Sequence, residues 1–251
     1  MKQPTRLVQR LDRRLYPEHA DRWDDVAFRR AILARLSPNS RVLDLGAGAG
    51  VVPEMDLRGE AGRVAGLDPD PRVLDNPYLD EAKIGCGESV PWPDGSFDLV
   101  IADNVLEHLE RPATVFCEVA RVLVPGGRFL VKTPNRRHYV ALVARLTPHS
   151  FHQAFNRSRG RATEDTFPTR YRANTPKRLR DLAAGAGLQL RDVELLEGRP
   201  EYLRRWPLTY LLGWLYERAV SSLPGLSGFR VLLIATFEKP HGPGLPDARP
   251  T

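Results

Sequence analysis

A short apolar segment followed by three glycines constrains this chain more than any other feature. Val42–Leu45 has the composition of a buried strand, and Gly46, Gly48 and Gly50 follow it at alternate positions. A glycine-rich loop costs conformational entropy, so it is usually found where the backbone must turn sharply and pass close to a ligand. In open α/β sheets, ligands bind beyond the carboxyl ends of the strands, which is where this loop would lie. A tight turn without a ligand is the alternative.

The spacing of the glycines narrows the class of ligand. A dinucleotide-binding loop has the pattern G-x-G-x-x-G and opens a helix that points at a pyrophosphate. Here the pattern is G-x-G-x-G, and Pro53 follows soon after. A pyrophosphate is therefore disfavoured, and the helix after the loop is expected to be short or irregular. Asp44, two residues before the first glycine, could hold an ammonium group, which nicotinamide dinucleotides do not present.

The composition fits one medium domain with a sizeable core. The chain has 251 residues, of which 42% are hydrophobic. Two cysteines, Cys86 and Cys117, indicate neither a disulfide framework nor a zinc site, and they suit a reducing compartment. Residues 1–14 lack the apolar segment of a secretory signal. We therefore expect a cytoplasmic protein, with association at the inner membrane face as a variant of that expectation.

The positive charge is concentrated in one part of the sequence. The formal net charge is +6, yet residues 136–180 contain eleven basic and two acidic residues. Such a segment suits an anionic substrate, a membrane surface or nucleic acid, although a solvated face is the simpler interpretation. No known nucleic-acid-binding module is present, so nucleic acid is not expected as a partner.

Strand and helix patterns alternate along the chain, which predicts a doubly wound α/β sheet with parallel strands. Strands are expected at 42–45, 63–68, 82–85, 97–102, 128–132, 188–196 and 231–237, and helices at 24–36, 114–123, 176–186 and 206–220. The nearly continuous apolar strand 97–102 should be central. We expect one domain over 1–239, in which 133–175 break the alternation as a helical lid and 203–222 hold an apolar helix. The Pro- and Gly-rich tail 240–251 is predicted to be disordered.

Four motifs follow one another in a fixed order. The glycine loop comes first, and Asp68 then ends the next strand. The later segments read S-V-P-W-P-D-G-S-F-D-L-V (89–100), A-D-N-V-L-E-H-L (102–109) and E-V-A-R-V-L-V-P-G-G (118–127). In this order and spacing they resemble the class I S-adenosylmethionine-dependent methyltransferases, and in particular the methyltransferase type 11 group. The resemblance covers roughly 40–135. It implies a Rossmann-like sheet of seven strands, mostly parallel with an antiparallel last strand.

The resemblance also implies which residues would bind S-adenosylmethionine. Asp44, Gly46, Ala47 and Gly48 would lie along the methionine part of the cofactor. Asp68 would accept hydrogen bonds from the ribose, Pro69 would pack near the adenine, and Cys86, Gly87 and Glu88 would flank it. Asp103 and Asn104 would lie beside the reactive methyl group. The sequence departs from the family at Cys86, where many relatives have an acid, so Glu88 or backbone groups would replace that contact.

A catalytic base is harder to choose. Methyl transfer needs the acceptor held in line with the methyl group, and positioning can supply most of the rate. The candidates for a base or for the acceptor pocket are His108, His138, Tyr139 and His152, and each has a structural role as its alternative. Tyr171 or Arg172 could recognise the substrate. No group of residues has the spacing of a metal site.

One apolar segment has several possible roles. Ten uncharged residues, 207–216, lie between arginine-containing pairs, which is too short to span a bilayer. The helix could lie in a membrane interface, cover the active site or form a homodimer contact.

The sequence as a whole predicts methyl transfer to a small-molecule acceptor, with oxygen as the first choice of acceptor atom. The expected context is secondary metabolism or the synthesis of envelope, lipid or sugar compounds, with an anionic or lipid-linked acceptor. The alternatives are a nitrogen or carbon acceptor, or a protein that binds the cofactor without transfer.

Overall fold

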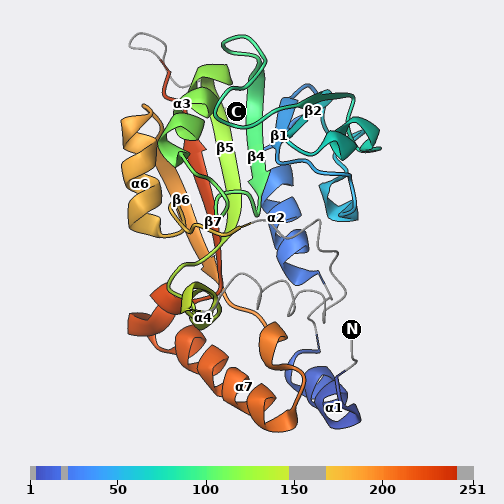
Figure 1. Ribbon diagram of the computed structural model, residues 1–251, viewed down its shortest axis with the longest axis vertical. Helices are drawn as coiled ribbons and strands as arrows, with labels where there is room; N and C mark the ends of the chain where they lie inside the picture. Colours follow the sequence, from blue (N-terminus) through green and yellow to red (C-terminus); the bar gives the residue numbers. More distant parts are fainter. Residues whose placement is uncertain (1–3, 18–21, 147–167, 242–251) are drawn as a thin grey trace, which may run out of the picture.

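A seven-stranded sheet forms the centre of the computed structural model, which describes residues 4–17, 22–146 and 168–241 (Figure 1). The strands are β1 (Arg41–Leu45), β2 (Arg63–Asp68), β3 (Glu81–Ile84), β4 (Phe97–Asp103), β5 (Leu123–Pro134), β6 (Gln189–Leu196) and β7 (Leu232–Glu238). Their order is β3-β2-β1-β4-β5-β7-β6. β1 to β5 pair in parallel, and β7 runs antiparallel to both β5 and β6. The predicted fold class and the central place of β4 are confirmed.

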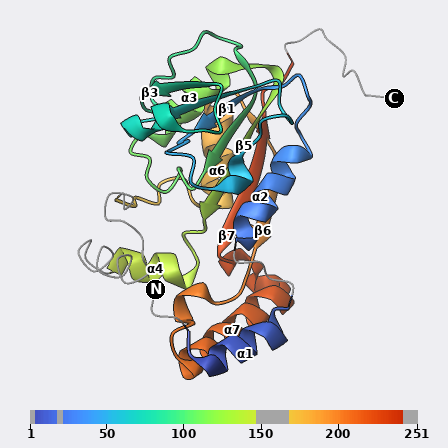
Figure 2. The same ribbon diagram turned by 90° about the vertical axis from the view of Figure 1, so that its right-hand side faces the viewer.

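Helices cover both faces of the sheet because its strands are apolar on both sides. On one face, α2 (Trp23–Leu33) inserts Phe28 and Ile32 against Leu99 and Ile101. On the other face, α3 (Pro112–Val122) and α6 (Pro176–Gly185) pack over the alternate side chains of the same strands, such as Val100. The side view in Figure 2 shows the sheet between these two layers.

A small helical lobe lies beyond the carboxyl ends of β4 and β5 in both views (Figures 1 and 2). It contains α1 (Arg6–Leu15), α4 (Tyr139–Leu146) and α7 (Pro207–Ser222), and α7 is inserted between β6 and β7. α1 and α7 share a small core in which Val8, Tyr16 and Tyr210 are buried. The lobe therefore lies at the edge of the sheet where a ligand of this fold would bind.

The glycine loop is followed by a single 3₁₀ turn, η1 (Pro53–Met55), as the early proline indicated. The structure differs from the predicted elements at β5 and at α1. β5 begins at Leu123 instead of 128, because Leu123 already pairs with Phe97 before a register shift. α1 was not predicted, since five of its ten residues are charged and only Val8 and Asp12 are buried. The remaining short helices are η2 (Pro71–Asp75), η4 (Glu201–Leu203) and η5 (Pro224–Phe229).

Two predicted segments fall largely outside the described residues. Of the expected lid at 133–175, the structure describes 133–146, which includes α4, and 168–175. The lid stays a prediction. The tail beyond His241, for which disorder was expected, also lies outside the described residues.

Candidate functional site

The glycine loop turns the chain sharply at the end of β1. Gly46, Gly48 and Gly50 have φ angles of 83°, 53° and 68°, a region that glycine enters without strain. A Cβ atom at Gly46 would lie 2.3 Å from Cγ2 of Val105, and one at Gly50 would lie 2.3 Å from Oδ1 of Asn76. A Cβ atom at Gly48 would meet nothing within 4 Å. The middle of the loop therefore borders open space, as expected where a ligand approaches the backbone.

Asp68 and Asn76 hold this loop in place. Oδ2 of Asp68 accepts a hydrogen bond from the Gly48 amide at 2.9 Å, and Oδ1 accepts one from the Asp70 amide at 2.8 Å. Nδ2 of Asn76, a buried residue, donates to the carbonyl oxygens of Ala47 at 3.0 Å and Gly48 at 3.1 Å. Each Asp68 oxygen keeps a further lone pair for the two hydroxyls of a ribose. Sequence reasoning missed Asn76, whose only local signal is the turn-forming pair with Pro77.

Asp44 is a buried carboxylate at the base of the loop. Only 7% of the residue is exposed, and none of the described residues donates a hydrogen bond to its oxygens. Burial raises the pKa of Asp44 to about 8, and the charges of Asp103 and Asp68 add to the effect. A buried acid without a donor is stabilised by a cation. The ammonium group of S-adenosylmethionine is such a cation, so these residues fit the methionine end of that cofactor.

Asp103, at the end of β4, belongs to a buried cluster of charges. The Nζ atom of Lys132, whose side chain is 0% exposed, lies 2.9 Å from Oδ1 of Asp103 and 3.3 Å from Oδ2 of Asp24, and it also contacts Asp25. Burial raises the pKa of Asp103 to about 6, although Lys132 lowers it. Burial lowers the pKa of Lys132, but the three carboxylates outweigh this effect and hold it above its ordinary value. No local sequence pattern joins Lys132 to α2, so this cluster was not predicted.

Asn104 continues the chain past Asp103 in a left-handed conformation, with a φ angle of 53°. Its side-chain amide donates to Oδ1 of Asp103 at 2.8 Å, and its backbone amide donates to the Lys132 carbonyl at 2.8 Å. Asn104 itself is exposed. The predicted role of both residues beside the reactive methyl group stays a prediction.

The residues predicted to surround the adenine lie in the loops after β2 and β3. Pro69 and Cys86 are exposed, Glu88 is half-buried and Gly87 is buried. A Cβ atom at Gly87 would lie 3.1 Å from Cγ1 of Val115 and 3.3 Å from Cδ1 of Leu45. The glycine thus lets this loop pack closely on α3 and β1. The contacts of the four residues with adenine stay predictions.

Glu107 and His108 connect the loop after β4 with the segment that precedes α6. The Glu107 carbonyl accepts hydrogen bonds from the amides of Arg170 at 2.6 Å and Tyr171 at 3.1 Å, and its carboxylate accepts one from Thr133 Oγ1 at 2.9 Å. Burial raises the pKa of Glu107 to about 7.

Nδ1 of His108 lies 3.0 Å from the carbonyl oxygen of Pro168. A carbonyl only accepts, so Nδ1 carries the proton in the neutral ring and Nε2 does not. Burial lowers the pKa of His108, which favours that neutral ring.

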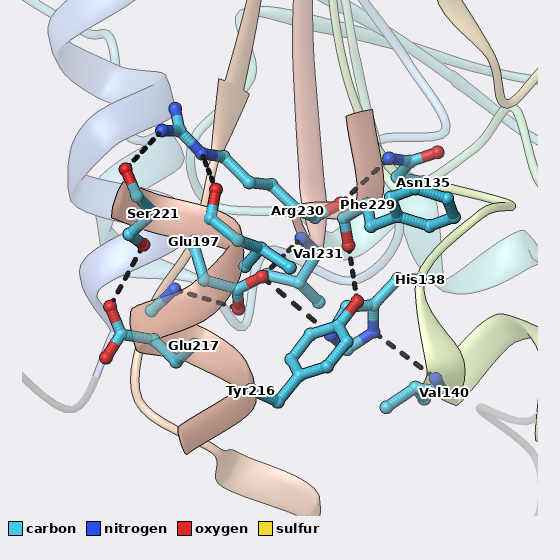
Figure 3. A network of polar contacts seen from close by, with 12 residues as sticks. Asn135, His138, Val140, Glu197, Tyr216, Glu217, Ser221, Phe229, Arg230 and Val231 are labelled. Atoms are coloured by element: carbon cyan, nitrogen blue, oxygen red, sulfur yellow. Dashed lines mark hydrogen bonds and ion pairs between the residues drawn. The ribbon is translucent and has the colours of Figure 1, made fainter. Parts of the chain in front are cut away.

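His138 lies at the junction between the sheet and the helical lobe (Figure 3), and Tyr139 follows it as the first residue of α4. The His138 ring is 4.2 Å from the Tyr139 ring and 5.4 Å from the Tyr216 ring, and its Nε2 atom is 3.9 Å from the Glu197 carboxylate. Burial lowers the pKa of His138 to about 3, so the ring is neutral at physiological pH. These contacts give both residues a packing role, and their predicted catalytic role stays untested. His152 lies outside the described residues.

No group of metal-ligating side chains occurs within the described ranges. The lining of the site is instead acidic and open at Gly48. This arrangement agrees with an organic cationic ligand.

The acidity of Asp44 leads to a prediction on pH. An ammonium group favours the ionised carboxylate, so binding of S-adenosylmethionine should release a proton below pH 8. Affinity should therefore rise with pH between 6 and 7.5, approaching roughly tenfold per pH unit. Without ligand, the stability of the folded state changes with pH in the opposite direction. Because the pKa of Asp44 in the folded state, about 8, exceeds the ordinary 3.8, the folded state loses stability as pH rises between these values. Calorimetry over this pH range checks the effect, and Asp44→Asn is the control that should flatten the profile. An equally steep profile in Asp44→Asn would exclude Asp44 as its source.

Known proteins resemble this chain over the same region. A family model described as a methyltransferase domain matches residues 43–131. A Mycolicibacterium smegmatis protein named "probable S-adenosylmethionine-dependent methyltransferase" is 38% identical over 117 residues, which are 45% of this chain and 44% of that protein. The malonyl-[acyl-carrier protein] O-methyltransferase of Halorhodospira halophila is 32% identical over 144 residues, 51% of this chain and 49% of that one. This chain thus spans less than half of the length of these curated relatives.

A solved structure agrees on the fold. The S-adenosylmethionine-dependent methyltransferase from Mesorhizobium loti superposes with a TM-score of 0.53 at 19% identity, over 88% of this chain and 99% of that one. The glycine loop and Asp68 lie within the residues that the methyltransferase domain model matches. Residues 43–131 therefore match a methyltransferase domain, and this part of the chain resembles S-adenosylmethionine-dependent methyltransferases.

Proposed function

We propose that this protein transfers a methyl group from S-adenosylmethionine to a small-molecule acceptor. The observation that carries the proposal is the Asp44 carboxylate, buried without a hydrogen-bond donor among the described residues, next to the open backbone at Gly48. In this proposal Asp44 holds the ammonium group and Asp68 the ribose. Bound S-adenosylmethionine supplies an electrophilic methyl group.

The protein's own contribution is to position the acceptor, exclude water and take up a proton. The helical lobe stands over the carboxyl edge of the sheet, where it can limit the access of water. The Glu107 backbone fixes the segment that carries Tyr171 and Arg172 at the same edge. In this proposal, residues of the loop after β4 and of the segment before α6 line one acceptor pocket.

We propose His108 as the group that accepts the proton of the acceptor. Its Nδ1 atom is engaged by the Pro168 carbonyl, which leaves Nε2 as the basic nitrogen of the neutral ring. The lowered pKa keeps that nitrogen unprotonated at neutral pH. The buried Glu107, 3.9 Å from Nε2, would stabilise the protonated ring once it forms.

Oxygen is our first choice of acceptor atom. The Halorhodospira halophila relative is named as an O-methyltransferase, although it matches this chain over only half of each. Three arginines, Arg136, Arg172 and Arg178, line a groove together with Tyr171 and Asn174. Their charge favours an acceptor with a carboxylate or phosphate group, including a lipid-linked one. A nitrogen or carbon acceptor remains the nearest alternative.

A screen of acceptors with detection of S-adenosylhomocysteine tests the proposal. Hydroxylated acids and phosphorylated alcohols should give turnover, and matched compounds without the anionic group should give less. Amines and carbon acids in the same screen test the alternative acceptor atoms. A protein that binds S-adenosylmethionine and yields no product with any of these classes would support binding without transfer.

Replacing His108 with glutamine should separate its proposed role from cofactor binding. We expect kcat to fall by roughly 10²–10⁴, because a positioned base contributes about that much, while the Kd for S-adenosylmethionine stays unchanged. The acidic limb of the pH–rate profile should also disappear. His241→Gln, on an exposed histidine after β7, is the control. Wild-type kcat in His108→Gln would remove His108 from the reaction.

A further inference from the structure

The outer face of α7 is an exposed apolar surface. Leu208, Leu211, Leu212 and Leu215 are 71%, 40%, 57% and 56% exposed, and Trp206 just before the helix is 57% exposed. Positions 208, 211, 212 and 215 repeat at helical spacing, so the four leucines form one continuous stripe. The opposite side of the same helix buries Tyr210, Gly213, Glu217 and Val220 against the protein. A contiguous stripe of this kind on a folded protein normally marks a surface that something covers.

The exposed charges that the structure describes on α1 and α7 have one sign. In residues 4–17 and 201–229, which include α1 and α7, the exposed charged side chains are all arginines: Arg6, Arg10, Arg13, Arg14, Arg205 and Arg218. The three acids of these segments are withdrawn from the surface. Asp12 is buried against Arg204, Glu217 is buried and accepts a hydrogen bond from Tyr16, and the half-buried Glu201 pairs with Arg199 and Arg204. The lobe therefore shows apolar and positive groups to its surroundings.

We propose that this lobe docks on an anionic lipid bilayer, with the leucine stripe of α7 in the interface and Arg205 and Arg218 against lipid phosphates. An apolar stripe with Trp and Arg beside it is the pattern of helices that lie in a membrane interface. The proposal concerns the surface of the bilayer, since none of the described helices is long and apolar enough to cross it. The docking does not depend on methyl transfer.

A second copy of the chain fits this face less well than a bilayer. A symmetric dimer brings the same surface of two copies together, and the described residues of α1 and α7 carry exposed arginines without exposed acids. An anionic membrane instead offers phosphates to Arg205, beside Trp206, and to Arg218, which within the chain pairs with Glu217 at 3.2 Å. The lobe also stands at the carboxyl edge of the sheet in Figures 1 and 2, so docking would bring that edge toward the lipid surface.

Co-sedimentation with vesicles tests the proposal. The full chain should sediment with vesicles of equal parts phosphatidylcholine and phosphatidylglycerol, and only weakly with phosphatidylcholine alone. For the double variant Leu212→Glu, Leu215→Glu, the lipid concentration at which half of the protein sediments should rise at least roughly tenfold. The control Leu74→Glu, Ile84→Glu adds the same charge at side chains of similar exposure, 57% and 52%, on η2 and β3. It should sediment like the wild type. Circular dichroism establishes that each variant is folded.

Three outcomes would overturn the proposal. The wild type could stay in the supernatant with the anionic vesicles, as it would if another part of this chain covers the stripe. The α7 double variant could sediment like the wild type. Sedimentation velocity could show a wild-type dimer that the same variant dissociates. Because the α7 variant should bind S-adenosylmethionine with wild-type affinity in calorimetry, failure here is distinct from failure of the proposed methyl transfer.

Discussion

Replacing Lys132 with methionine should lower the free energy of unfolding by about 3–5 kcal/mol, since it leaves buried carboxylates without their cation. Lys132 is the cation at the centre of Asp24, Asp25 and Asp103, and methionine keeps most of its length. Urea denaturation at pH 7.5 measures the change. The loss should shrink toward pH 5, where Asp103, with a pKa near 6 in the wild type, takes up a proton.

Two further variants make the test of Lys132 specific. Lys83→Met removes a half-exposed lysine 3.3 Å from Glu81 and should cost less than about 1 kcal/mol. Adding Asp25→Asn to Lys132→Met should recover part of the lost stability, which a double-mutant cycle quantifies. A Lys132→Met variant no less stable than Lys83→Met would show that the cluster does not depend on its lysine.

Replacing Asp68 with alanine should weaken the binding of S-adenosylmethionine roughly 100-fold, because the ribose hydroxyls lose a buried acceptor. The substitution also frees the Gly48 amide, whose hydrogen bond to Asp68 is 2.9 Å long. Asp68→Asn keeps one acceptor oxygen, so its affinity for S-adenosylmethionine should lie between those of the wild type and Asp68→Ala. Asp70→Ala, two residues further on, removes the half-buried cap of η2 and should change the Kd only slightly. Calorimetry showing wild-type affinity in Asp68→Ala would remove Asp68 from the site.

Much of the fold could be predicted from the sequence because local patterns decide it. β2 begins at Arg63 and ends at Asp68 as expected, since an apolar segment lies between a glycine and a proline-containing turn. The 3₁₀ turn after the glycine loop follows from Pro53. α1 could not be predicted, because its stability comes from packing on α7 through Val8 and Tyr210 and its own sequence is mostly polar.

The candidate site was predictable only where a motif carries it. Asp44, Gly48 and Asp68 stand in a recognisable order, and the structure brings them to one edge of the sheet. Lys132 and Asp24 are 108 positions apart, and no local pattern joins them. Likewise, the apolar segment 207–216 shows only that α7 is rich in leucines and aromatic residues. Which of them stay exposed depends on how α1 and η4 cover the helix.

Calorimetric titration of the wild-type chain with S-adenosylmethionine, beside Asp44→Asn, tests the central claim most directly. We expect saturable binding at one site per chain in the wild type, with proton release near pH 7 that is lost in Asp44→Asn. A folded wild-type protein that binds no S-adenosylmethionine would contradict the account.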